Sequence, residues 1–127
     1  MMVVSPPIRV LLVDDQEAFR SAARLVVELA EGFSLSDEAE TAEDALQLIG
    51  GGEYDLVLMD INLPGIDGLE ATRRITGTHN SLKVIVLSTY EAGEYESRAK
   101  EAGAIGFISK SEFGPAQLIN TWQGSLD

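Results

Sequence analysis

Six polar residues of this chain stand directly after apolar runs, where strands of a buried sheet would end. They are Asp14, Asp15, Asp60, Ser88, Thr89 and Lys110. Carboxylates suit a hard cation such as Mg2+, which leaves other positions for water and phosphate. A lysine and a hydroxyl can bind phosphoryl oxygens. With the metal and the lysine neutralising charge, a carboxylate such as Asp60 could attack phosphorus and form an acyl phosphate.

The strongest strand signal is the unbroken apolar run at residues 56–59, which is typical of a strand buried on both faces of a parallel sheet. Asp60 ends this run, and a turn follows at residues 63–65, so Asp60 should lie in the crevice where parallel sheets bind ligands. Taken alone, it would more often be an inert carboxylate that caps the next helix or bonds to the loop. Residues 8–13 form a second buried run that ends in two acids. If the two strands are neighbours, their carboxylates need a cation, from a metal or a lysine.

Strand-like and helix-like segments alternate along the chain. We expect strands at residues 8–13, 33–38, 56–60, 83–88 and 103–109, and helices at about residues 19–30, 42–49, 69–75, 93–102 and from Pro115 onward. The pattern predicts a single doubly wound α/β domain, a flavodoxin-like (βα)5 unit whose five-stranded parallel sheet has helices on both faces. Because parallel strands share a carboxyl edge, the polar strand ends should converge.

Length and charge exclude several classes of protein. The 127 residues suffice for one domain, expected to occupy residues 1–127 with a core at about 8–122 and no effector domain. Acids outnumber Lys plus Arg by 21 to 9, and a net charge of −12 makes direct nucleic-acid binding unexpected. No apolar run reaches the ~20 residues of a membrane span. The absence of cysteine fits a reducing cytoplasm and excludes thiolate metal sites.

At these spacings the polar residues resemble those of one family, the receiver domains of two-component response regulators, over about residues 8–122. The resemblance is carried by Asp14-Asp15, by Asp60 followed by Leu63-Pro64-Gly65 and Gly68, by Ser88, and by Lys110 preceded by Gly106-Phe107. Each motif is weak alone, but the ordered set is specific. Receivers that precede a helix-turn-helix DNA-binding domain are the most similar in style, since Ser111 rather than a cis proline follows the lysine.

The resemblance implies phosphoryl chemistry at Asp60. This residue would be the phosphoacceptor and would take its phosphoryl group from a histidine kinase or a phosphotransfer protein. Mg2+ would be bound by Asp15, Asp60 and the backbone carbonyl of Asn62, with Asp14 acting through a metal-bound water. Gly68 needs no functional role, because it could simply free the backbone that enters the third helix.

The same resemblance assigns a switch to the neighbouring strand ends. Lys110 would pair with the phosphoryl group, Ser88 would be the switch hydroxyl, and Phe107 would be the aromatic side chain that changes rotamer with it. Phe107 could equally be a plain core residue, and Ser88 could be a surface hydroxyl. Thr89 and Tyr90 are expected to narrow access to the phosphoryl group and so to slow its hydrolysis.

The helix predicted at residues 93–102 has only a thin apolar stripe, so it should be the least anchored helix. We therefore expect phosphorylation to change the surface formed by this helix, the last strand and the final helix. By resemblance, that surface would control an output, expected to be transcription through an effector outside this chain, and could also support a homodimer. The expected role is signalling and not enzymatic turnover.

Two other functions stay open on the sequence. A phosphorylation-independent interaction module could share the fold, but it would not need the acids. A Mg2+-dependent phosphatase of the haloacid-dehalogenase type also uses a strand-end aspartate, but it needs a second acid two residues later, where this chain has Asn62. A dinucleotide-binding domain is disfavoured, because residues 14–17 carry acids where a glycine-rich phosphate loop is required.

Overall fold

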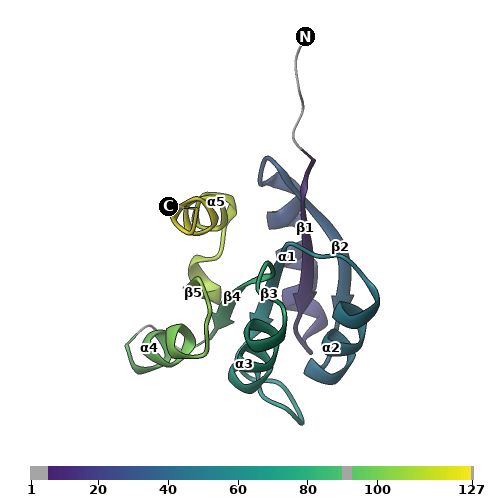
Figure 1. Cartoon of the computed structure of the whole chain (residues 1–127). Coiled ribbons are helices and arrows are strands. Elements are labelled where there is room, and N and C mark those ends of the chain that lie inside the picture. Colours follow the sequence, from purple (N-terminus) through teal and green to yellow (C-terminus); the bar gives the residue numbers. More distant parts are fainter. Residues whose placement is uncertain (1–5, 90–92, 127) are drawn as a thin grey trace.

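The fold is a five-stranded parallel sheet with helices on both faces (Figure 1), seen in a computed structural model that describes residues 6–89 and 93–126. The strands are β1 (Ile8–Val13), β2 (Phe33–Ala39), β3 (Leu56–Asp60), β4 (Lys83–Ser88) and β5 (Gly106–Ser109). The helices are α1 (Glu17–Leu29), α2 (Ala42–Gly51), α3 (Gly68–Thr78), α4 (Glu94–Glu101) and α5 (Pro115–Gly124), with a short 3-10 helix, η1 (Lys110–Glu112). The strand order β2-β1-β3-β4-β5 confirms the predicted doubly wound topology.

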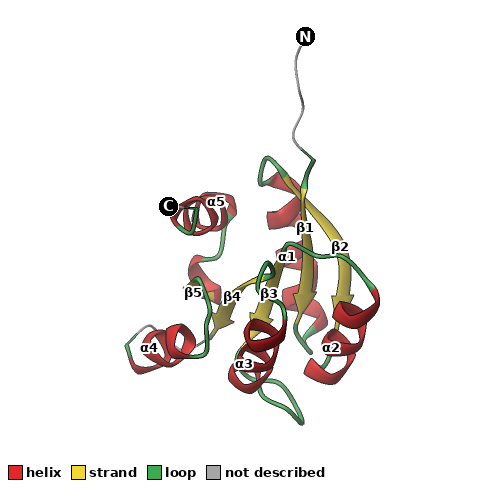
Figure 2. Cartoon of the chain, viewed as in Figure 1, coloured by secondary structure: helices red, strands yellow, loops and turns green. Residues whose placement is uncertain are grey.

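Side chains that alternate along the central strands form two separate cores. In β3, Val57 and Met59 pack on the face covered by α2, α3 and α4, whereas Leu56 and Leu58 pack on the face covered by α1 and α5 (Figure 2). All four are fully buried, which explains why this strand is an unbroken apolar run. Because β3 lies between β1 and β4 at the centre of the sheet, Asp60 at its end lies at the centre of the carboxyl edge.

Helix starts follow the local sequence closely. The Thr41 hydroxyl accepts a hydrogen bond from Asp44 N at 3.0 Å and so caps α2, as threonine often does at this position. Asp67, which the sequence pattern did not single out, caps α3 in the same way by accepting from Glu70 N at 2.8 Å. Pro115 is the first residue of α5.

The last strand differs most from prediction. It begins at Gly106 and not at Gly103, because residues 102–104 form the capping turn that follows α4: Gly103 has a φ of 103°, and Ala104 N bonds to Ala99 O at 3.0 Å. The chain then turns through η1, which the sequence pattern did not indicate. This turn places Lys110 against α1.

Helix α4 has few buried side chains, but so does α5, in which Leu118 alone is buried among the described residues, so α4 is not set apart as the least anchored helix. In α4, Ala99 is the one buried residue among those the structure describes. Its other described side chains are half-buried or exposed, and they include the Glu96–Lys100 ion pair at 3.6 Å. Within residues 6–89 and 93–126, no helix combines the length and the apolar character that crossing a bilayer requires.

Candidate functional site

Four neighbouring strands bring their polar ends together at one edge of the sheet. Asp14 follows β1, Asp60 ends β3, Ser88 ends β4 and Lys110 follows β5. The carboxylates of Asp14, Asp15 and Asp60 offer oxygen atoms that all lie within 4.8 Å of one another. The predicted convergence of these acids is therefore present in the fold.

Lys110 joins the acids through a buried ion pair. Its Nζ lies 2.6 Å from Asp14 Oδ2 and 3.4 Å from Asp60 Oδ2, and its side chain is 8% exposed. Asp14 is completely buried and Asp60 is 3% exposed. A buried carboxylate needs a compensating positive charge, and the Lys110 ammonium supplies one positive charge for two carboxylates. The site therefore carries excess negative charge.

The excess charge is visible in the ionisation of Asp60. Burial and the neighbouring Asp14 carboxylate raise the pKa of Asp60 to about 6, against partial compensation from Lys110 and from Asn62 N, which donates to Asp60 Oδ1 at 3.2 Å. Burial contributes most to this raised pKa and the Asp14 carboxylate adds to it, while the one ammonium of Lys110 is shared between the two acids. A divalent ion bound between the carboxylates would offset their repulsion.

The donor set fits such an ion. Three carboxylates are hard oxygen ligands of the kind that Mg2+ takes, and exposed Asp15 leaves the site open to solvent on one side. Asp14 Oδ1 accepts from Gln16 N at 2.8 Å. Asp14 Oδ2 is buried and has no hydrogen-bond partner among the described residues, only the ion pair with Lys110, so it retains acceptor capacity that a metal-bound water would use.

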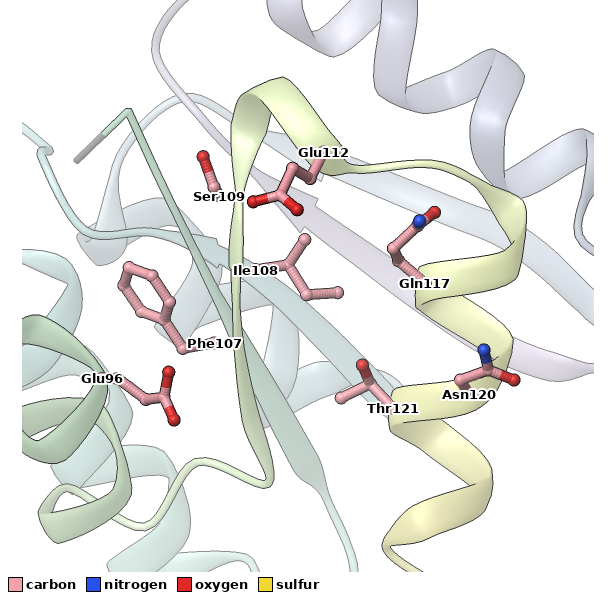
Figure 3. Close-up of a pocket in the computed structure, with 8 residues that line it drawn as sticks. All are labelled: Glu96, Phe107, Ile108, Ser109, Glu112, Gln117, Asn120 and Thr121. Carbon is pink, nitrogen blue, oxygen red and sulfur yellow. The ribbon is translucent and has the colours of Figure 1, made fainter. Parts of the chain in front are cut away.

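The predicted switch residues lie in different environments. Ser88 is completely buried and is opposite Ser109 in the β4–β5 register, whereas Thr89 is exposed at the end of β4. Tyr90 lies outside the described residues. Phe107 is half-buried, packs against the core on the α2–α4 face, and lines a cavity of about 350 Å³ between α4, β5 and α5 (Figure 3).

Position 68 requires glycine for a steric reason that the sequence did not reveal. Its φ is not in the left-handed region, so backbone freedom is not what it provides. A Cβ built there would overlap Asp60 O and come within 2.8 Å of Ile61 Cα. Because only a residue without a side chain fits there, α3 can start directly against the loop that carries Asp60 and Asn62.

Arg20 is a site neighbour that sequence reasoning missed. It is 8% exposed, and its Nη1 donates to the backbone carbonyl of Asp14 at 2.7 Å. Ion pairs at 3.4 Å to Glu38 and 3.6 Å to Glu40 hold the guanidinium beneath the β1–α1 loop. A signal was present, since Arg20 precedes Ala23 by three positions on the buried stripe of α1.

Comparison with known proteins agrees with this geometry. A model of the response regulator receiver domain matches residues 10–123. Response regulator UvrY of Escherichia coli (strain K12) is 40% identical over 113 residues, which are 89% of this chain and 51% of that protein. Response regulator GacA of Pseudomonas aeruginosa is 37% identical over 103 residues, 81% of this chain and 48% of that protein. The chain spans about half the length of these curated relatives.

Solved structures give the same result. A LuxR-family two-component response regulator from Aurantimonas sp. SI85-9A1 superposes with a TM-score of 0.84 at 32% identity, covering 94% of this chain and 85% of that one. A CheY-like receiver domain protein from Methanospirillum hungatei JF-1 superposes with a TM-score of 0.80 at 29% identity, covering 97% of this chain and 95% of that one. The family model, the sequence relatives and the solved structures all indicate the same family. The chain therefore belongs to the response regulator receiver domain family of two-component signalling systems.

Proposed function

We propose that this chain is a phosphorylation-activated switch in which Asp60 accepts a phosphoryl group from a histidine kinase or a phosphotransfer protein. The observation that carries the proposal is the Lys110 ammonium between Asp14 and Asp60, at 2.6 and 3.4 Å, beside a third carboxylate. A nucleophilic carboxylate, a fixed cation and spare oxygen ligands are what phosphoryl transfer to an aspartate needs.

In the proposed reaction, an Asp60 carboxylate oxygen forms a bond to phosphorus as the bond from phosphorus to the donor's histidine nitrogen breaks. The electron pair of that bond leaves with the imidazole, which takes up a proton. Lys110 stabilises the charge on the phosphoryl oxygens. Mg2+ would supply a second positive charge at these oxygens. Asp15, Asp60 and the Asn62 carbonyl are the proposed ligands of the ion, and Asp14 would act through a bound water.

The proposed switch couples that reaction to the far side of β4 and β5. A phosphoryl group on Asp60 adds charge and acceptors, which Ser88 can approach with its hydroxyl. Space freed beside Ser88 would let Phe107 turn inward, next to the α4–β5–α5 cavity. Thr89 would stand at the entrance to the phosphoryl group and slow its hydrolysis. Each of these roles is part of the proposal.

The proposed output surface consists of α4, β5 and α5. Helix α4 buries one described side chain, Ala99, so little apolar area opposes its displacement. The surface would act on transcription through an effector, or through a homodimer, and not by direct DNA contact, because the chain carries a net charge of −12. The chain would act in the cytoplasm, which its lack of cysteine fits, as a signalling domain and not as an enzyme.

Intact-protein mass spectrometry after incubation with Mg2+ and acetyl phosphate tests the proposal. We expect one phosphoryl adduct on the wild-type chain and none on Asp60→Asn. Steady release of phosphate from varied monoesters would indicate the phosphatase instead, and the absence of any adduct would leave the phosphorylation-independent module. Amide hydrogen exchange in α4, β5 and α5 that does not change on phosphorylation would refute the output surface.

A further inference from the structure

Lys110 contacts an aromatic ring as well as the two acids. Its Nζ lies 4.4 Å from the centroid of the Phe19 ring, which belongs to the first turn of α1. The ammonium therefore has three described neighbours from three different elements: Asp14 after β1, Asp60 on β3 and Phe19 on α1.

The same ring also anchors the turn that carries the lysine. Phe113, directly after η1, lies with its ring centroid 6.2 Å from that of Phe19, at an interplanar angle of 40°. Within the turn, the hydrogen bond from Phe113 N to Lys110 O is long, at 3.4 Å. Because η1 is short and this hydrogen bond is long, the aromatic contact with α1 adds to the two ion pairs that hold Lys110.

The face of an aromatic ring attracts a cation through its quadrupole, and the attraction grows when water is excluded. Lys110 is nearly buried, which places this contact at the strong end of that range. The two carboxylates attract the ammonium from the side of the sheet, while the ring lies against it from α1. The ring thus limits the positions that a flexible four-carbon side chain can adopt.

We propose that Phe19 is a positioning residue for Lys110: its ring face holds the ammonium at the point where it meets phosphoryl oxygens on Asp60. This role rests on the proposed phosphoryl transfer and adds a residue of α1 to it. Loss of the ring's negative face would leave Lys110 in place on the chain but spread over more rotamers, so phosphorylation would slow without any loss of a reacting group.

The test separates ring electrostatics from packing. 3,4,5-Trifluorophenylalanine at position 19 nearly keeps the shape of the ring but removes most of the negative potential of its face. The same residue at position 113 is the matched control, because Phe113 contacts Phe19 but has no described contact with the ammonium. The rate constant for phosphorylation by acetyl phosphate with Mg2+ should fall about fivefold at position 19 and less than twofold at position 113.

A second measurement does not depend on phosphorylation. The Lys110 side-chain methylene protons next to Nζ should show an upfield ring-current shift that disappears in Phe19→Leu and persists in Phe113→Leu. If the wild-type chain is phosphorylated and the two fluorinated variants react equally, the positioning role is wrong. If the wild-type chain takes no phosphoryl group, the proposed function fails. In that case the ring-current shift still tests the placement of Lys110: its absence refutes the contact with Phe19, and its presence supports it.

Discussion

Asp60→Asn should stabilise the fold at neutral pH in the absence of divalent ions. The wild-type carboxyl group is buried beside Asp14, and its pKa is raised from 3.8 to about 6. The folded state therefore holds this proton more tightly than the unfolded chain does. Stability from this group is complete below pH 3.8 and is lost as the pH rises to about 6, after which the loss is constant.

The size of the effect follows from the shift. About 2 pKa units correspond to roughly 3 kcal/mol of differential free energy, at about 1.4 kcal/mol per unit. Water reaches the site past exposed Asp15, so we expect about 2 kcal/mol of this to be measurable. The side-chain amide that replaces the carboxylate in Asp60→Asn has no charge to desolvate, and Lys110 keeps its partner Asp14 at 2.6 Å.

Urea unfolding in EDTA, at several pH values between 4 and 8, measures the prediction. The stability difference between Asp60→Asn and the wild type should be small near pH 4 and reach about 2 kcal/mol above pH 7. Asp44→Asn, at an exposed position in the first turn of α2, is the matched control, and the rise in stability difference at Asp60 should exceed any change seen at Asp44. Mg2+ should stabilise the wild type and reduce the difference. A difference that is constant with pH, or an Asp60→Asn variant that is less stable than the wild type at pH 7.5 without metal, would refute the reasoning.

Three further predictions address the residues that support the site. Arg20→Met removes the guanidinium beneath the β1–α1 loop and should weaken Mg2+ binding about tenfold in an NMR titration, with a stability loss of about 2–3 kcal/mol; unchanged affinity would contradict it. Gly68→Ala places a Cβ on the backbone of β3 and should destabilise by about 3 kcal/mol, whereas Gly77→Ala, which meets open space in α3, should stabilise by about 0.5–1 kcal/mol. Thr89→Ala should shorten the acyl phosphate lifetime in a radiolabel chase, and an equal lifetime would remove Thr89 from the proposed role.

Much of the fold could be predicted from the sequence, because strands and helix starts depend on residues that are close together along the chain. The apolar run that ends at Asp60 is long enough for a strand and too short for an ordinary helix, and it has no polar face. Parallel strands share a carboxyl edge, so the order of polar strand ends was enough to predict that Asp14, Asp15 and Asp60 meet and that Lys110 lies beside them. Thr41 and Pro115 marked helix starts by chemistry that acts within one turn.

Other features were decided only in the tertiary structure. The sequence suggested that Gly68 frees the backbone entering the third helix, but it is required because the Asp60 carbonyl occupies the space of a side chain. Arg20 was not singled out from the sequence, but its guanidinium donates to the Asp14 carbonyl and pairs with acids at the end of β2. Phe19 lies 91 positions before Lys110 in the sequence, yet its ring contacts the ammonium. Whether the partners are 8 or 91 positions apart, these contacts depend on side-chain directions and close approaches that exist only once the sheet and its helices have packed. Periodicity can indicate which face of an element is buried, but packing decides which atom each side chain meets there.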